Sequence, residues 1–433
     1  MKRSLTLILV ATAMLMLAAG PALAGAFRIP EAGAKAMGFG NAFVGMADDP
    51  SAVLFNPAGI TQLEGNRIQT GVTAIATQND YTDTGGTKSS AKDGHFFPPS
   101  FYYTNHLGEG QWWLGLGVTA PFGLGTEWEV DSFNYVATET MIEMVKINPT
   151  LAYRVSDQWS VAFGLDYYSV LDASLQNDMS STLVFAATGG ALQAVGVQEL
   201  SGDGSSFGFN VGALFKATDD LSIGFAYRTG TDLEVEGDVT ASVKATGSLL
   251  QTFPATADIG LPATAALGIN YKFSNAWQLN LDLDWTGWSY YDKLEVKNSA
   301  GVVQNPLASA KDYDNVTAIR VGVEYTLSDT WALRGGFLTE PSPIPEETYD
   351  PRLPGGDRTG YVIGAGYESG KWTLDLAYMF VQLDKTTVDS DAVAIADIDV
   401  PSLPTIVPTA FQNVDGSYEG DITLIGVSVG YAF

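Results

Sequence analysis

Two histidines, His95 and His106, are the side chains best suited to acid–base chemistry in this chain, which has no cysteine. Nucleophilic catalysis needs a base placed beside a nucleophile such as serine or threonine. His95 follows a polar stretch that ends at Gly94, and His106 lies beside a short turn that we expect on the other side of the molecule. Neither belongs to a recognisable catalytic motif. We therefore expect no catalytic residues and no enzyme.

Acidic side chains are the second candidates for chemistry, because hard cations such as Ca²⁺ bind carboxylate oxygens. Asp48 and Asp49 are adjacent. Four more aspartates lie close together near the C-terminus: Asp389, Asp391, Asp397 and Asp399. Their spacing matches no calcium-binding motif, and no thiolate site can form without cysteine. We expect solvated charge, no metal site and no cofactor.

The overall charge excludes one further class of partner. The chain carries 22 Lys and Arg residues against 49 Asp and Glu residues, for a net charge of −27. A chain this acidic has no general positive field that would attract phosphate groups. We therefore expect no nucleic-acid partner.

The first 24 residues have the organisation of a secretory signal peptide. A positive start at residues 1–3 precedes an apolar run over residues 5–17, and Ala-Leu-Ala at residues 22–24 is a small-x-small cleavage site. The rest of the chain has no apolar run long enough for a transmembrane helix, which needs about 18 residues or more. We assign residues 1–24 to a signal peptide and expect an exported protein.

Segments that alternate between large apolar and other residues recur through the remaining chain. From Trp277 to Trp285, five large apolar residues alternate with Gln, Asn, Asp and Asp. From Trp159 to Tyr167, the second face is mostly small residues. Soluble sheets also alternate, with polar residues facing water. The recurrence of the pattern and the small residues on the second face therefore distinguish these segments from the strands of a soluble sheet.

The connections between these segments alternate between short and long. Tight polar turns precede the large apolar residues with which these segments begin, as at residues 156–158, 218–220 and 274–276. Long polar stretches lie between them: about 80–95, 121–140, 172–205, 230–259, 292–312, 340–358 and 381–416. Short turns on one side and long loops on the other are typical of outer-membrane barrels. Aromatic residues flank the short turns and predict a girdle at one membrane interface.

We therefore predict an all-β fold, a transmembrane antiparallel β-barrel of about 14 strands over residues 65–433, an even number as closure requires. The last strand ends in Tyr431-Ala432-Phe433. This ending resembles the terminal signal that the outer-membrane assembly machinery of bacteria recognises. We expect a multi-pass protein in the outer membrane of a Gram-negative bacterium.

Residues 25–64 belong to no predicted strand, and a barrel of this size has a lumen wider than side chains alone can fill. The segment is rich in glycine and turns at Asn56-Pro57-Ala58. Glycine permits close packing and left-handed turns, and proline fixes a bend. We predict an N-terminal plug, or hatch, in the lumen. The alternative is an ordinary lead-in to the first strand.

A second irregularity lies in the third predicted strand, where residues 112–118 run into Ala120-Pro121-Phe122-Gly123. Proline removes a donor from the strand ladder, and glycine weakens pairing and allows a bend. We predict an inward kink that opens a gap in the wall, where exposed backbone is tolerated only if protein or a cavity covers it. Alternatively, Pro121 marks the outer end of the strand.

Six segments of the chain resemble the FadL-type long-chain fatty-acid transporters, in order and over essentially the whole mature chain. They are NPA at 56–58, APFGLGTE at 120–127, INPTLAYR at 147–154, LPAT at 261–264, WTGWS at 285–289 and PRLPGGDR at 351–358.

The resemblance implies a fourteen-stranded barrel with the hatch inside it and a lateral gap at an inward kink of the third strand. Asn56-Pro57-Ala58 corresponds to the family's hatch turn, and Ala120 to Gly123 corresponds to the kink. Gly212 corresponds to a small residue that the family keeps beside the gap. An apolar ligand is then expected to enter from outside, pass two binding sites and leave sideways into outer-membrane lipid once the hatch shifts.

The expected ligand is a long-chain fatty acid. The fatty-acid members place a basic residue for the carboxylate near the outer end of the fifth strand, where this chain has Gln176. Lys311, just before the tenth strand, corresponds to the family's other basic contact. The family also includes carriers of aromatic hydrocarbons such as toluene, so a neutral ligand is the alternative. A general porin and an adhesin barrel are further alternatives, and we expect a monomer.

Overall fold

The computed structural model describes residues 26–128, 133–179, 191–298, 307–389 and 414–433, together with residues 181, 184 and 188. The predicted signal peptide, residues 1–24, lies outside the described residues. So do Asp391, Asp397 and Asp399 of the acidic stretch near the C-terminus.

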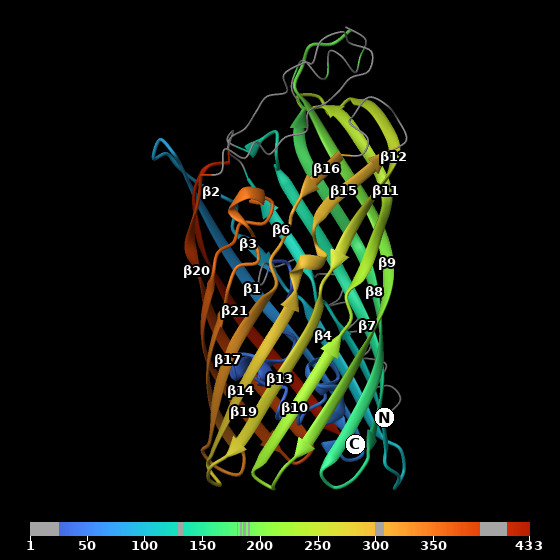
Figure 1. Ribbon diagram of the computed structural model, residues 1–433, viewed down its shortest axis with the longest axis vertical. Helices are drawn as coiled ribbons and strands as arrows, with labels where there is room; N and C mark the ends of the chain where they lie inside the picture. Colours follow the sequence, from blue (N-terminus) through green and yellow to red (C-terminus); the bar gives the residue numbers. More distant parts are fainter. Residues whose placement is uncertain are drawn as a thin grey trace.

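Over the described residues, the strand segments form one closed antiparallel barrel of 14 strands, which confirms the predicted fold class (Figure 1). The barrel closes where β1 (Asn66–Asp83) pairs with β21 (Gly416–Ala432). Short turns gather at the lower end of Figure 1, and longer connections gather at the upper end. We call the first the periplasmic end and the second the outer end, as in other barrels of this class.

Some barrel strands are single segments and others are divided. The single ones besides β1 and β21 are β7 (Glu139–Arg154), β8 (Trp159–Met179), β9 (Gly196–Lys216), β18 (Trp331–Glu340), β19 (Arg358–Ser369) and β20 (Trp372–Val388). The divided ones are β2 (Lys88–Ser90) with β3 (Gly94–Phe96) and β4 (Pro99–His106); β5 (Trp112–Thr119) with β6 (Gly123–Glu127); β10 (Leu221–Arg228) with β11 (Thr231–Val243); β12 (Leu249–Leu261) with β13 (Ala263–Lys272); β14 (Trp277–Gly287) with β15 (Lys293–Asn298); and β16 (Leu307–Ala310) with β17 (Val316–Thr326).

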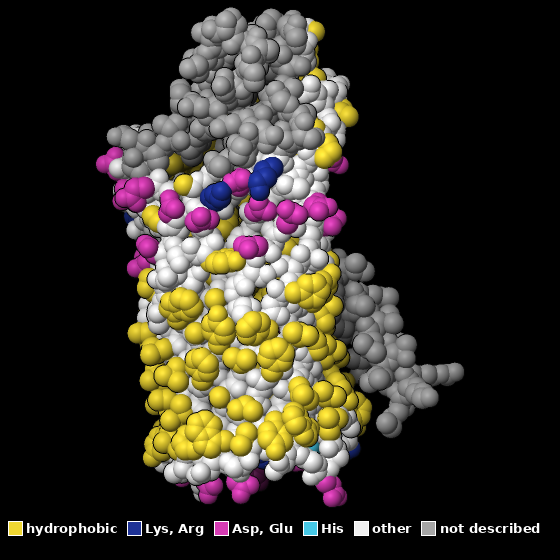
Figure 2. All heavy atoms as spheres, turned by 45° about the vertical axis from the view of Figure 1, so that its right-hand side comes forward, with side chains coloured by type: hydrophobic (Ala, Val, Ile, Leu, Met, Phe, Trp, Pro, Cys, Tyr) yellow, Lys and Arg dark blue, Asp and Glu magenta, His cyan; other side chains and the backbone are white. Residues whose placement is uncertain are grey.

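Aromatic side chains pair between neighbouring strands near the periplasmic end of the membrane-facing surface. Ring centroids lie 4.5 to 4.8 Å apart in the pairs Trp112–Tyr153, Trp159–Phe215, Trp277–Tyr325, Trp331–Tyr367 and Trp372–Tyr431. Figure 2 shows hydrophobic side chains as a broad band on the barrel surface, with acidic side chains above and below it. The rings therefore lie where amphipathic side chains favour a membrane interface.

Several strands run on through stretches that the sequence predicts as long loops. β8 and β9 stay paired as far as Met179 opposite Gly196. β11 and β12 pair with each other over most of residues 231–261. Polar residues mark where the membrane ends, whereas a strand continues as long as its backbone groups find partners. The barrel wall therefore rises above the membrane-facing band.

Residues 26–64, which we call the hatch segment, lie in the lumen toward the periplasmic end (blue in Figure 1). The segment contains the short helix α2 (Ala34–Gly38), the single turn α3 (Ala52–Phe55) and the 3₁₀ helix η1 (Pro57–Gln62). α2 packs against β19, β20 and β21, whereas η1 packs against β5, β7, β8 and β9. None of the helices in the described residues is long and apolar enough to cross a membrane.

Glycines on the inner face of the wall let the hatch segment approach the strands. A Cβ atom at Gly224 would lie 2.0 Å from the carbonyl oxygen of Val44. A Cβ atom at Gly322 would lie 2.5 Å from the Cβ of Phe39. Any side chain at these positions would therefore displace the hatch backbone. The small second face seen in the sequence is, at these positions, the surface against which the hatch segment packs.

Candidate functional site

The Asn56-Pro57-Ala58 turn joins the hatch segment to the barrel wall. The side-chain amide of Asn56 donates hydrogen bonds to the carbonyl oxygens of Val44, at 2.9 Å, and of Ala213, at 3.0 Å. Its side-chain oxygen accepts a hydrogen bond from the backbone N–H of Ala58 at 3.2 Å and so caps η1. Asn56 is fully buried, so the loss of these bonds would leave polar groups without water or protein partners.

Gly212 lies on β9 beside this turn. A Cβ atom at Gly212 would lie 2.5 Å from Asn56 Oδ1 and 2.8 Å from Pro57 Cδ. The turn can therefore approach the wall this closely because residue 212 is glycine. The neighbouring Asn210 and Val211 line a cavity that Pro121 also lines. The structure thus places Gly212 against the hatch turn, one residue from the cavity at the predicted kink.

The third barrel strand is interrupted at Ala120-Pro121-Phe122, which we call the strand break. β5 pairs with β7 as far as Thr119, which lies opposite Lys146. Pairing with β7 resumes in β6 at Gly123, which lies opposite Glu143. Between these two pairs the third strand has one residue more than β7. One extra residue in one strand of a pair makes a bulge and bends that strand.

Backbone groups at the strand break bind the start of the hatch segment instead of a neighbouring strand. The N–H of Ile29 donates to the carbonyl oxygen of Pro121 at 2.8 Å. The N–H of Gly123 donates to the carbonyl oxygen of Phe27 at 2.9 Å. In the described part of the chain, no backbone hydrogen bond joins residues 93–98 of the second barrel strand to residues 120–126 of the third. The ladder of the wall is therefore open over this interval.

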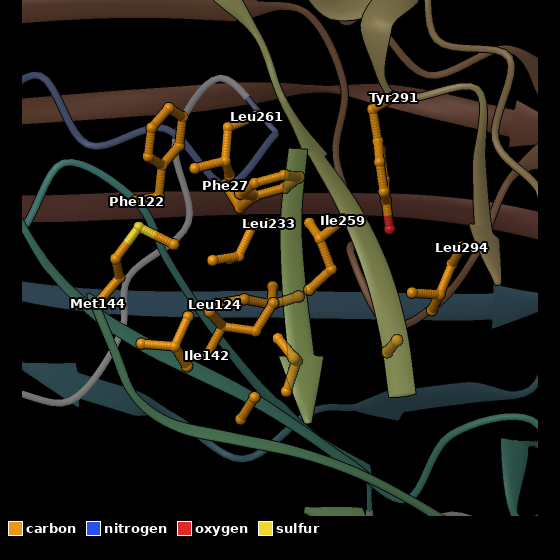
Figure 3. Close-up of a cluster of buried hydrophobic side chains, with 14 of the residues drawn as sticks. Phe27, Phe122, Leu124, Ile142, Met144, Leu233, Ile259, Leu261, Tyr291 and Leu294 are labelled. Carbon is orange, nitrogen blue, oxygen red and sulfur yellow. The ribbon is translucent and has the colours of Figure 1, made fainter. Parts of the chain in front are cut away.

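A small apolar cavity of about 40 Å³ lies on the outer side of the strand break. Its lining includes Phe27, Leu124, Ile142, Leu200, Ile259 and Leu294. Figure 3 shows the side chain of Phe27 among those of the surrounding strands. The Phe27 ring lies 4.9 Å from that of Trp288 and 5.5 Å from that of Tyr291, between centroids. Phe27 thus fills most of an apolar site that would otherwise be larger.

A charged cluster of Lys311, Asp350 and Arg352 lies at the edge of this cavity. Lys311 Nζ forms an ion pair with Asp350 Oδ2, and Arg352 Nη1 lies 3.0 Å from the same oxygen. Burial lowers the pKa of the Lys311 amine, and Asp350 offsets part of this effect. Burial alone would raise the pKa of the Asp350 carboxyl, but Arg352 and Lys311 lower it below its usual range. Two basic side chains therefore share one carboxylate.

Gln176 lies elsewhere in the wall. In the strand register it is opposite Glu139 of β7 and Glu199 of β9. Its side-chain oxygen accepts a hydrogen bond from Thr138 Oγ1 at 3.2 Å. The preceding residue, Leu175, lines the apolar cavity, whereas Gln176 does not, as expected for successive strand residues that point to opposite faces. The structure therefore does not bring Gln176 and Lys311 together.

Further cavities adjoin the hatch segment, among them the break cavity and the periplasmic vestibule. The break cavity, of about 80 Å³, is lined by Pro121, Pro57, residues 28–30, Lys146 and Arg228 among others. The periplasmic vestibule, of about 700 Å³, is open at the periplasmic end and has many charged side chains in its lining, such as Lys35, Asp48, Arg334 and Asp375. The hatch segment thus borders a cavity with both apolar and charged side chains at the strand break and a polar opening at the periplasmic end.

Among the residues of these sites that were not predicted from the sequence are Phe27, Lys146 and Arg352. The signal for Lys146 was present, because the lumen-facing residues of β7 recur at every second position and Lys146 falls in that series, between Met144 and Asn148. Arg352 lies in a segment that resembles the transporter family, but nothing local marks its contact with Asp350. Phe27 carries no signal, because its contact with the strand break depends on tertiary structure.

The residues first considered for catalysis lie apart from these cavities. His106 lies at the periplasmic end, with Nε2 2.7 Å from the carbonyl oxygen of Gly110, and its ring stacks on Trp113 with centroids 4.0 Å apart. His95 lies on β3. Within the described ranges, no group of three or more His, Asp or Glu side chains is arranged to hold a metal ion.

The chain is similar to known outer-membrane proteins in sequence and in fold. Residues 15–433 match the family described as outer membrane protein transport protein (OMPP1/FadL/TodX). The chain is 24% identical to the long-chain fatty acid transport protein of Escherichia coli O6:H1 (strain CFT073), over 92% of each chain. The structure of a Pseudomonas aeruginosa FadL homologue shares the fold with a TM-score of 0.79 at 21% identity, over 94% of this chain and 100% of that one. The structure of the P. putida toluene transporter TodX shares the fold with a TM-score of 0.66 at 17% identity, over 89% of this chain and 94% of that one.

Proposed function

This chain belongs to the OMPP1/FadL/TodX family of outer membrane transport proteins, and we propose that it moves hydrophobic molecules, in the first place long-chain fatty acids, across the outer membrane. The protein is a multi-pass barrel in the outer membrane of a Gram-negative bacterium. The observation that carries the proposal is the apolar cavity beside an open stretch of the wall, filled by Phe27 of the hatch segment. An apolar ligand would take the place that Phe27 now occupies.

Ligand binding would couple to the strand break through Phe27. The cavity of about 40 Å³ is too small for a long alkyl chain, so the ligand has to displace the Phe27 ring. Each buried methylene contributes about 0.8 kcal/mol, which is enough for a long chain to compete with one phenyl ring. The backbone of Phe27 and Ile29 also bonds to the strand break. Displacement of residues 27–29 therefore frees the backbone at the break.

The cluster at the edge of the cavity supports a fatty acid as the ligand. Lys311 and Arg352 share Asp350, so one positive charge remains for a ligand carboxylate. Hydrogen bonds to charged groups contribute about 1.5–3 kcal/mol. The long-chain fatty acid transport protein of E. coli, which covers the same length of chain, carries that ligand in its name.

A neutral aromatic hydrocarbon is the second candidate. The rings of Phe27, Trp288 and Tyr291 surround the cavity with aromatic surface, and Asp350 already partners the two basic side chains. The family includes the P. putida toluene transporter. A ligand without charge would use the same apolar contacts and ignore the cluster.

We propose that the ligand leaves sideways through the open interval of the wall at Pro121. The periplasmic vestibule beyond the hatch segment is polar and charged, so release there would expose the whole apolar chain to water. Exit through the wall keeps the chain in contact with apolar surface and then with outer-membrane lipid. The Asn56-Pro57-Ala58 turn would hold the hatch segment in place while this happens.

Ligand binding by the purified protein tests the proposed function. Calorimetry in detergent should show binding of a long-chain fatty acid, and weaker binding of toluene. Binding of toluene without any binding of the fatty acid would establish a neutral aromatic hydrocarbon as the ligand. Entry of a small hydrophilic sugar into liposomes that contain the protein would instead indicate a general porin. If none of these occurs, the barrel serves as an adhesin or structural protein.

We further propose that the barrel acts as a monomer inserted by the outer-membrane assembly machinery. Each chain has its own closed wall and its own hatch segment, so no second copy is needed to complete the path. Native mass spectrometry of the detergent-solubilised protein should give the mass of one chain. A stable dimer or trimer would contradict this part of the proposal.

A further inference from the structure

We propose that Lys146 and Arg228 form an anion-binding site in the break cavity, and that it takes the carboxylate of a fatty acid on its way out through the wall. This inference rests on the proposed function and adds a second head-group site to it. The first site, at Lys311, lies at the apolar cavity toward the outer end. The second lies at the strand break itself.

Lys146 is the buried basic group in this region with the poorest partner. Its side chain is 2% exposed, and Nζ makes no hydrogen bond within the described residues. The nearest carboxylate oxygen, Asp166 Oδ1, lies 3.8 Å away, which is beyond hydrogen-bonding distance. A buried amine without a hydrogen-bond partner is costly, and ionisable groups inside a membrane protein commonly mark a ligand or ion path.

Asp166 forms no close ion pair with Lys146, because its carboxylate is already bound to two other side chains. Arg228 Nη1 forms an ion pair with the same oxygen, Oδ1. The side-chain amide of Asn210 donates to Oδ2 at 3.0 Å. Two basic side chains therefore face one carboxylate that is also hydrogen-bonded to a third group. An added anion would give Lys146 the close partner that Asp166 does not provide.

The other two basic side chains that line the break cavity, Arg28 and Arg320, share Asp284, and Arg320 also pairs with Glu340. Arg28 pairs with Asp284 at 3.1 Å. Arg320 pairs with Asp284 and with Glu340, each at 3.4 Å. Asp282, which also lines the cavity, accepts hydrogen bonds from the backbone N–H groups of Phe43 and Val44 at 2.7 and 2.8 Å. Lys146 and Arg228 are therefore the two basic side chains of this cavity that depend on a single carboxylate, Asp166.

The position of Lys146 connects this site to the exit. Lys146 lies opposite Thr119, the last residue of β5 before the strand break. Pro121 and Phe122 line the same cavity. The cavity holds about 80 Å³, and a single water needs about 10–15 Å³ by this measure, so a carboxylate group fits. A ligand whose head group is held at Lys146 has its chain beside the open interval of the wall.

A second cation at the strand break would stabilise the carboxylate of the ligand on the exit path. A carboxylate that leaves the Lys311 cluster would otherwise cross apolar surface without a partner, and burial of an unpaired charge is strongly unfavourable. Lys146 supplies a partner at the point of departure. A neutral ligand would not need one, so the site distinguishes carboxylates from hydrocarbons.

Uptake into liposomes by the full barrel tests the site, with a long-chain fatty acid and the alcohol of the same chain length as the two probes. Lys146→Met keeps the length of the side chain and removes its amine. We expect fatty-acid uptake to fall at least fivefold while alcohol uptake changes less than twofold. Asp166→Asn removes the competing carboxylate, and we expect it to retain the fatty acid longer and slow its release. Lys216→Met, on the periplasmic part of β9, is the matched control and should leave both uptake rates unchanged.

The outcomes distinguish a failure of the proposed transport function from a failure of the proposed site at Lys146. If the wild-type protein takes up neither probe, the proposed function is wrong. If the wild-type protein takes up the fatty acid and Lys146→Met leaves the ratio of the two uptake rates unchanged, the second site is wrong and the function stands. Equal losses for both probes, with an unchanged melting temperature, would also overturn the site, since they would show that Lys146 supports the path without binding the carboxylate.

Discussion

The side-chain amide of Asn56 donates a hydrogen bond to the carbonyl oxygen of Ala213, 3.0 Å away, and this bond fastens the hatch turn to strand β9 of the wall. The same amide also bonds to Val44 within the hatch segment. One buried side chain therefore holds together two parts of the hatch segment and the barrel. The strength of this connection decides how easily the hatch segment can shift.

Asn56→Ala should loosen the hatch segment without unfolding the barrel. The change removes the bond that Asn56 Oδ1 accepts from Ala58 and two donated hydrogen bonds, and the donated bonds contribute about 1 kcal/mol each. Local opening should then be easier by about 2 kcal/mol, so amide hydrogen exchange over residues 44–62 should accelerate about 30-fold. Asn275→Ala, in an exposed turn, is the control and should change nothing in that segment. Unchanged protection in Asn56→Ala would show that the hatch segment is held elsewhere.

Gly212→Val should reduce uptake of the ligand while the barrel still folds. The added side chain would overlap Asn56 Oδ1 and Pro57 Cδ, so the hatch turn has to move away from the wall and into the break cavity that Pro57 lines. Gly335→Val is the matched control, because a Cβ atom there meets nothing closer than 3.8 Å. We expect uptake to fall several-fold in the first variant and to stay near wild type in the second. Equal uptake by both variants would show that the hatch turn has no part in the path of the ligand.

Deletion of Pro121 should close the open interval of the wall. The third strand has one residue too many between the pairs at Thr119 and Gly123, so a single deletion restores the register with β7. We expect ligand binding to persist and uptake to be lost. Pro121→Ala keeps the extra residue and is the control, which should retain most of the uptake. Uptake that survives the deletion would point to release at the periplasmic end.

Phe27→Ala should tighten ligand binding and destabilise the empty protein. The ligand would no longer have to displace the ring, while the unfilled site should cost about 3–5 kcal/mol, as for other buried Phe→Ala changes. Calorimetry should therefore show a higher affinity, and the melting temperature of the ligand-free protein should fall. Phe97→Ala is the control, since Phe97 is 46% exposed. Weaker binding in Phe27→Ala would mean that Phe27 contacts the ligand and does not take its place.

Lys311→Met should weaken the binding of a fatty acid and spare the alcohol of the same chain length. A hydrogen bond to a charged group contributes about 1.5 kcal/mol or more, so the fatty-acid affinity should fall about tenfold. Lys88→Met, in an exposed outer strand, controls for the loss of one positive charge. If the affinity for the fatty acid is unchanged, the head group binds elsewhere or the physiological ligand is neutral.

The barrel strands were predictable from the sequence, and so was an irregularity at Pro121, because both follow from local covalent properties. Side chains of a strand alternate between two faces, so the series from Trp277 to Trp285 predicts a wall strand wherever it lies in the molecule. Proline lacks a backbone donor in every context, so Pro121 predicts a weak point in the ladder. The extent of the strands was less predictable, because polar residues such as those near Met179 remain in β8 as long as β9 pairs with them.

The charges and contacts of the candidate site were decided by tertiary structure alone. Lys311 is a basic residue in the sequence, but only the fold places Asp350 against it. The role proposed for Lys146 depends on Arg228 and Asn210, which hold the carboxylate nearest to it in the described part of the chain, Asp166. Coulomb energy and burial depend on distance in space, and these partners lie on different strands whose register is set by the closure of the whole barrel. Sequence spacing therefore carries no information about which charges meet.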